Sequence, residues 1–213
     1  MEIQQAIEIR RSIRAYGDRP VEREKLEAVL RAGNQAPIFG RLHMSVFAGP
    51  EQLQAVDAAA VAGMARSGVP FLENLAAQEG YHPLYGAAAL VVLSAPGGLD
   101  EKGFNMANVS CAAENMLLAA AGLGLGSCFL MGPMAAFSDP ALRARPERPG
   151  LRPLVGVALS YAAFERPPPR SGRMPVSPGA DKQSGGALSG GLRFIHCFIC
   201  FQRRAWACWA PPS

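Results

Sequence analysis

The sequence predicts one domain of the α/β or α+β class, and three observations support this prediction. Segments with helical hydrophobic periodicity recur along the chain, short apolar runs of strand length alternate with them, and 213 residues suffice for one substantial core. The composition, 49% hydrophobic and 18% charged, is typical of a globular protein. No apolar run reaches the roughly 18 to 20 residues of a membrane-spanning helix, and the N-terminus lacks the apolar core of a signal peptide. We therefore expect a cytoplasmic protein.

The N-terminal half is expected to contain three helices and two strands. Ile3, Ala6 and Ile7 share one helical face, which predicts a first helix that ends near Arg11. Pro20 is expected to open the second helix, because proline suits the first helical position. The other expected elements are a strand at 43–47, a helix at 50–66 and a buried strand at 87–95.

The strongest helical pattern lies between Asn105 and Gly126. Its apolar residues recur at 3.6 spacing and its other faces carry mainly small residues, so the helix is expected to be buried, either centrally or at a subunit interface. We assign Ala113 to the face that meets a second subunit. The glycines of "GLGLG" follow this helix and precede a strand, which predicts a helix C-cap and a tight reversal rather than a dinucleotide-binding loop. Two further strands are expected at 127–130 and 153–160.

The composition changes near Pro178, which predicts a domain at 1–177 and a separate tail at 178–213. A Gly/Ser-rich spacer opens the tail, and both tryptophans and three of the five cysteines follow it. A zinc ion could use the tail residues His196, Cys197, Cys200 and Cys208, but a single CxxC with aromatic flanks favours an incidental cysteine-rich segment. We therefore expect no metal.

The charges and the scarce histidines exclude several functions. The formal net charge is +4, but four of the 21 Lys and Arg and one of the 17 Asp and Glu lie in the tail, so the body is nearly neutral. We therefore expect no nucleic-acid partner. The body contains His43 and His82 but no HExxH motif and no nucleophile elbow, which argues against hydrolytic chemistry. We assign no catalytic acid, base or nucleophile.

Arginines gather near both ends of the expected domain. "RRSIRAY" at 10–16 places three arginines in five residues, and Arg170 and Arg173 lie in the proline-rich segment near the other end. Guanidinium groups match a phosphate in forked geometry, and Ser12 can donate a further hydrogen bond. A solvated helix end followed by a linker explains the same residues, so the pattern alone leaves both interpretations open.

Over about residues 1–177 the chain resembles the nitroreductase family of FMN-dependent oxidoreductases. Four segments carry the resemblance in the right order: "IEIRRSIRAYGDRPVEREKLEAVLRAG", "AENMLLAAAGLGLGSCFLMGPMAA", "PLVGVALSY" and "PPPRSGRMP". The resemblance implies an α+β nitroreductase-like fold with a mixed central sheet of about four to five strands flanked by helices. It also implies a homodimer with FMN at the interface, NADH or NADPH as the hydride donor, and a nitroaromatic, quinone or similar small acceptor. A non-catalytic FMN-binding or redox-sensing protein, and a dehydrogenase or dehalogenase on the same scaffold, are the alternatives.

The resemblance also implies which residues bind FMN. Arg10, Arg11 and Ser12 would hold the phosphate and ribityl end, and Arg14 would lie near the pyrimidine edge of the ring. Arg170 and Arg173 would close on the phosphate from the C-terminal side. Phe129, Leu130, Met131 and Gly132 would border the ring. Pro37, Ile38 and Phe39 stand where the partner chain contributes, and they replace a polar stretch found in many members.

Overall fold

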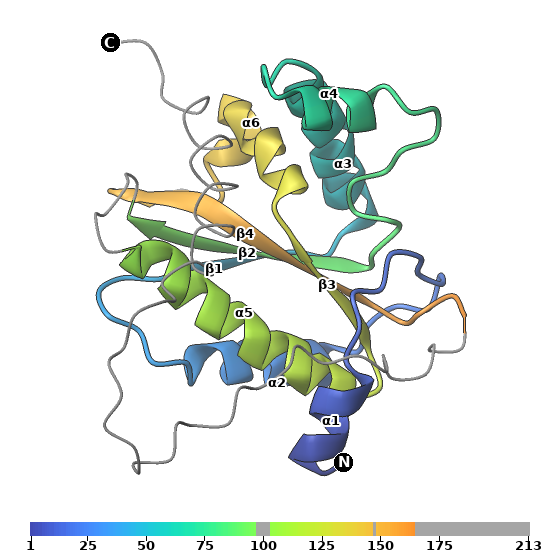
Figure 1. Ribbon diagram of the computed structural model, residues 1–213, viewed down its shortest axis with the longest axis vertical. Coiled ribbons are helices and arrows are strands. Elements are labelled where there is room, and N and C mark those ends of the chain that lie inside the picture. The colour runs from blue at the N-terminus through green and yellow to red at the C-terminus, as the bar shows by residue number, and fades with distance from the viewer. Residues whose placement is uncertain (97–102, 147, 165–213) are drawn as a thin grey trace, which may run out of the picture. The chain divides into compact units, whose positions relative to one another are not determined.

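The computed structural model describes residues 1–96, 103–146 and 148–164, and these residues build one four-stranded sheet with helices on both faces (Figure 1). The strand order is β1-β2-β4-β3 and every pairing of these strands is antiparallel. A parallel contact occurs at the isolated bridge between Ser12 and Ser127. The strands are β1 (His43–Phe47), β2 (Ala89–Pro96), β3 (Gly126–Leu130) and β4 (Leu151–Ser160).

The helices divide between the two faces of the sheet. α2 and α5 cover one face, and α3 with the 3-10 helix η1 covers the other (Figure 1). α1 packs on α5, α4 packs on α3 and α6 packs on η1. The bounds are α1 (Ile3–Ile9), α2 (Arg23–Asn34), α3 (Pro50–Ala65), α4 (Pro70–Ala76), α5 (Phe104–Gly122), η1 (Gly132–Ser138) and α6 (Pro140–Arg143).

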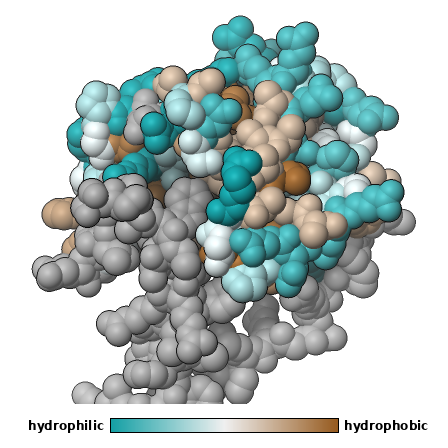
Figure 2. All heavy atoms as spheres, turned by 90° about the horizontal axis from the view of Figure 1, so that it is seen from above, coloured by the Kyte–Doolittle hydropathy of each residue, from teal (hydrophilic) through white to brown (hydrophobic). Residues whose placement is uncertain are grey.

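Strand β2 shows why two layers of helices form. Val91 and Leu93 point into the core under α2 and α5, whereas Leu90 and Val92 point into the core under α3 and η1. Successive side chains of a strand alternate between faces, so a continuous apolar run needs a cover on both sides. On the outer surface over α3, α4 and α6, hydrophilic side chains surround an area where apolar ones gather (Figure 2).

Most expected elements are confirmed, with shifts of a few residues at their ends. The strand at 43–47 has the predicted bounds, and Gly124 adopts the left-handed conformation (φ +80°) that the C-cap interpretation requires. α2 begins at Arg23 and not at Pro20 as expected, because the backbone of Glu22 is still extended (φ −63°, ψ 141°). No helix of the described residues is long and apolar enough to cross a membrane.

The assignment of Ala113 to a subunit interface is wrong. Ala112 and Ala113 are fully buried in the chain's own core, in the same cluster as Val91 of β2. The exposed side of α5 instead carries Cys111 and Glu114. Small residues such as Ala113 suit close packing against the sheet as well as against a second subunit, so the sequence leaves both open and the packing decides between them.

A polar cluster ties the start of α2 to the end of β4. The Glu22 carboxylate accepts hydrogen bonds of 2.6 Å from the Tyr161 hydroxyl and of 2.6 Å from Arg19. Lys25 donates to the Tyr161 hydroxyl at 2.7 Å, and the Arg19 guanidinium lies 4.0 Å from the centre of the Tyr161 ring. The backbone N–H of Gly17 donates to the Tyr161 carbonyl at 2.9 Å. The cluster therefore holds the segment that follows α1 against the sheet.

We expect the stabilising effect of Glu22 to depend on pH. The hydrogen bond from Tyr161, with smaller contributions from Arg19 and Lys25, lowers the pKa of the Glu22 carboxyl from 4.5 to about 2. A carboxyl whose pKa is lower in the folded chain stabilises the fold above its unfolded pKa, and this effect is lost as the pH falls from 4.5 towards 2. Glu22→Gln should therefore lower the Tm near neutral pH, and the difference from the wild type should shrink below about pH 4.

Thermal unfolding followed by circular dichroism at several pH values measures this difference. Glu24→Gln, on an exposed position of the same helix, removes the same charge and serves as the control. Because Glu22 is itself partly exposed, the effect should weaken in high salt. A Tm difference that is equal at all pH values would contradict the prediction.

Candidate functional site

The basic segment Arg10–Arg14 leaves α1 and runs in parallel beside β3. The backbone N–H of Ile13 donates to the Ser127 carbonyl at 2.9 Å, next to the bridge between Ser12 and Ser127. Ile13 is buried, whereas Ser12 and Arg14 on either side of it are exposed. This is the alternation of an extended chain, and it leaves the polar side chains of the segment accessible.

The arginines of this segment differ in their surroundings. Arg10 Nε lies 3.0 Å from Glu114 Oε1 of α5 in a partly exposed ion pair. Arg11 donates to the carbonyl oxygens of Glu8 and Arg10 at 2.9 and 2.6 Å. Arg14 is exposed. The segment thus combines three guanidinium groups and a serine hydroxyl, a donor set that suits an anion with several oxygens.

The basic segment lies close enough to β3 to affect the pKa of the Cys128 thiol on that strand. Burial raises the pKa of this thiol, while the charge of Arg14, a hydrogen bond with Ser12 and the charge of Arg10 act in the opposite direction. Cys128 is completely buried. The positive charge of the segment therefore extends over the middle of β3.

The four residues expected at a flavin ring, Phe129–Gly132, follow Cys128 at the end of β3 and lead into η1. Since Ser12 and Ser127 pair in parallel, the chain at Arg14 runs beside the chain at Phe129. Leu130 is buried, whereas Met131 is 48% exposed at the turn from β3 into η1. The structure thus brings two of the predicted groups together, the basic segment and the end of β3.

The third group, Pro37–Phe39, lies against the first turns of α5. The buried Asn108 fixes it by two hydrogen bonds, from Phe39 N to Oδ1 at 3.0 Å and from Nδ2 to the Phe39 carbonyl at 2.6 Å. The Phe39 side chain is 74% exposed and its ring lies 5.3 Å from that of Phe104. Asn108 precedes Glu114 by six residues, or about 9 Å along the helix axis. Within one chain, the loop and the Arg10–Glu114 pair are therefore anchored at separate places on α5.

Several predicted features lie outside the described residues. They include Arg170 and Arg173, the boundary at 177/178 and the tail residues His196, Cys197, Cys200 and Cys208. Within the part of the chain that the structure describes, no group of three or more His, Cys, Asp or Glu side chains could hold a metal ion.

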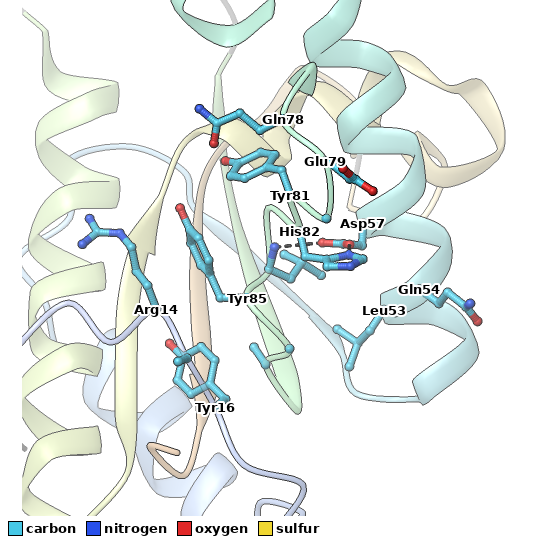
Figure 3. A pocket seen from close by; sticks show the side chains of 15 residues that line it. Arg14, Tyr16, Leu53, Gln54, Asp57, Gln78, Glu79, Tyr81, His82 and Tyr85 are labelled. Carbon is cyan, nitrogen blue, oxygen red and sulfur yellow. Dashed lines mark hydrogen bonds and ion pairs between the residues drawn. The ribbon is translucent and has the colours of Figure 1, made fainter. Parts of the chain in front are cut away.

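A cavity of about 700 Å³ opens beside Arg14 (Figure 3). Arg14 lies on one side of it and Asp57 with His82 on the other, with Tyr81 and Tyr85 between them. The rings of the two tyrosines meet edge to face at 6.3 Å. The other lining residues are Ala15, Tyr16, Leu53, Gln54, Gln78, Glu79, Gly80, Leu84, Gly86 and Ala87.

Among the lining residues of this cavity, Arg14 has a role that the sequence predicts, and the others do not. Asp57 and His82 stand 25 residues apart, in a helix and in a loop, so their contact has no local signal. The structure itself marks the neighbouring "LYG", where Tyr85 (φ +56°) and Gly86 (φ +77°) both adopt the left-handed conformation. A non-glycine residue in that region is strained, and such strain often marks a functional site.

Comparisons with known proteins identify the family of the chain. The model of the nitroreductase family matches residues 7–156. A protein from Archaeoglobus fulgidus named NADH dehydrogenase/NAD(P)H nitroreductase is 31% identical over 161 residues, which are 73% of this chain and 76% of that protein. A nitroreductase from Bacteroides fragilis, solved with bound FMN, is 27% identical over 84% of this chain and 100% of its own, with a TM-score of 0.69. A nitroreductase from Desulfitobacterium hafniense has the same fold at 21% identity, with a TM-score of 0.70 over 81% of this chain and 95% of its own. The chain belongs to the nitroreductase family, as the basic segment beside β3 and the helix-strand unit of α5 and β3 predict.

Proposed function

We propose that this protein is an FMN-dependent oxidoreductase that accepts a hydride from NADH or NADPH and reduces a small acceptor, a nitroaromatic compound or a quinone. The observation that carries the proposal is the parallel alignment of the basic segment on β3. In this alignment Arg14 runs beside Phe129. This supports a phosphate held by the basic segment and a flavin ring next to Phe129–Gly132. The related proteins from A. fulgidus and B. fragilis are named for NAD(P)H and FMN, respectively.

The side chains of the basic segment fit FMN chemically. Arg10, Arg11 and Ser12 would hold the phosphate and the ribityl end through charge-assisted hydrogen bonds. Arg14 would stand at the pyrimidine edge of the ring, where a fixed positive charge stabilises the negative charge of the reduced ring. When bound, FMN supplies the hydride chemistry, and the chain supplies binding, orientation and charge.

The second part of the proposal is a homodimer in which the partner completes each site. The exposed Phe39–Phe104 pair supports it, because two large aromatic side chains lie together at the surface near α5. The loop at Pro37–Phe39 is anchored at a different place on α5 from the Arg10–Glu114 pair. We infer that this loop serves the site of the other subunit. Arg170 and Arg173 would then complete the phosphate site.

The visible spectrum of the purified protein tests the function. We expect the yellow absorbance of bound FMN, its bleaching by NADH or NADPH under nitrogen, and its return when menadione or nitrofurazone is added. Free FMN with the same reductant measures the uncatalysed rate. Colour that persists with both reductants would instead indicate a flavin carrier or redox sensor, and a protein that binds no FMN would overturn the proposal.

A further inference from the structure

The cavity beside Arg14 has the size and lining of a small-molecule site. Its volume of about 700 Å³ lies within the range usual for such sites. Apolar and aromatic side chains form most of its wall, and a few polar groups converge on it from three parts of the chain: the basic segment, α3 and the loop before β2. Since Arg14 belongs both to the proposed flavin site and to this wall, a molecule in the cavity lies next to the proposed pyrimidine edge.

A carboxylate–imidazole pair stands on the wall opposite Arg14 (Figure 3). Asp57 Oδ2 lies 2.7 Å from His82 Nδ1, and Asp57 Oδ1 accepts the backbone N–H of Leu84 at 2.8 Å. Both carboxylate oxygens are thus engaged, and the side chain is only 16% exposed. An ionised carboxylate can only accept, so Nδ1 carries a proton and Nε2 is the nitrogen free to exchange a proton with a ligand.

The phenols of Tyr16 and Tyr81 near the imidazole both have raised pKa values. Burial raises the pKa of Tyr16, and burial together with a hydrogen bond to Tyr85 raises the pKa of Tyr81, so both phenols stay protonated. The remaining charged or ionisable lining residues are Arg14, Asp57, Glu79 and Tyr85. Histidine is the side chain whose ordinary titration range lies between about pH 5 and 8. His82 is 69% exposed at the cavity and can be reprotonated from solvent.

We propose that His82, positioned by Asp57, is a catalytic proton donor to a small quinone bound in this cavity. The inference rests on the proposed function and adds to it the source of a proton. Reduction of a quinone to a hydroquinone takes up two electrons and two hydrogens. NAD(P)H supplies the electron pair and one hydrogen as a hydride, and the protonated imidazole of His82 supplies the second hydrogen from Nε2 to a quinone oxygen. Solvent then returns a proton to Nε2.

The variant His82→Gln tests the proposal, because glutamine can donate a hydrogen bond but cannot release a proton. The flavin of the holoprotein is first reduced with dithionite, and its reoxidation by menadione under nitrogen is followed by stopped-flow absorbance between about pH 5.5 and 8.5. A positioned acid accelerates such a step by roughly 10²–10⁴, and since solvent competes in an open cavity we expect the variant to be at least about tenfold slower near pH 6. The wild-type rate should fall as the pH rises, and the rate of the variant should be flat.

Ferricyanide provides the control oxidant, because it takes single electrons and no proton. Its reaction with the reduced flavin should be the same in His82→Gln and in the wild type. Asp57→Asn keeps the shape of the pair but presents an N–H to the imidazole in at least one orientation, so it should slow the menadione reaction while leaving the ferricyanide rate unchanged.

The outcomes separate this inference from the proposed function. An equal loss with menadione and ferricyanide would show that His82 only shapes the cavity, and an unchanged menadione rate would show that water supplies the proton; either overturns the inference and leaves the flavin function intact. Because dithionite reduces the flavin in place of NAD(P)H, the test of His82 can be carried out even if the protein does not accept a hydride from NADH or NADPH. A protein without flavin overturns both proposals.

Discussion

Replacing Arg10 by alanine is expected to weaken FMN binding by roughly ten- to a hundredfold. A hydrogen bond to a charged group contributes on the order of 1.5–3 kcal/mol, and about 1.4 kcal/mol corresponds to a tenfold change in Kd. The structure gives a second reason to expect weaker FMN binding. Arg10 now neutralises Glu114 at 3.0 Å, so its removal leaves that carboxylate alone beside the place proposed for the phosphate. Titration of the apoprotein with FMN, followed by flavin fluorescence, gives the Kd.

Two variants control this experiment. Glu114→Gln removes the carboxylate and keeps the guanidinium, so FMN should bind no more weakly than to the wild type. Arg23→Ala removes an exposed arginine of α2 whose ion pair with Glu27 lies on the helix surface, and it should leave the Kd unchanged. An Arg10→Ala protein with the wild-type Kd would mean that the basic segment is only a solvated helix end.

The second large effect is expected at Gly63, where α3 meets η1. A Cβ at this position would lie 2.4 Å from the Ala135 carbonyl oxygen and 2.8 Å from its carbonyl carbon, and both atoms belong to backbone. Alanine is the better helix former by about 1 kcal/mol, but the two helices must move apart to accept its methyl group. Overpacking of this kind costs roughly 1–3 kcal/mol, so we expect Gly63→Ala to lower the Tm by several degrees.

Gly122→Ala is the matched control. Gly122 is the last residue of α5, and a Cβ there would meet no atom within 4 Å. The same substitution should therefore be neutral or stabilise by up to about 1 kcal/mol. Thermal unfolding gives the Tm of both variants, and we expect that of Gly63→Ala to be the lower. Equal Tm values would show that α3 and η1 do not approach each other as closely as described. Since η1 follows Met131 directly, the Gly63 variant should also release FMN more readily.

The local pattern of the sequence determined the strands, the long helices and the family. The strand at 43–47, the apolar run of β2 and the C-cap at Gly124 follow from hydrophobic periodicity and from the freedom of glycine at positive φ, both of which involve neighbouring residues. The short helices α4 and α6, of seven and four residues, were missed because they are too short to show a helical period. The basic segment was recognised because its three arginines and its serine are contiguous.

Only the tertiary structure decided which faces and which distant residues meet. Ala113 and Cys111 stand in one run of small residues, yet the first lies in the core and the second is exposed. Gly63 and Gly122 both lie in helices, and only the backbone of η1 makes a larger side chain costly at Gly63. Asp57 and His82 are ordinary residues of a helix and a loop until the fold brings them to 2.7 Å. In each case the deciding interaction joins segments far apart in the chain, and a local sequence pattern carries no information about such a contact.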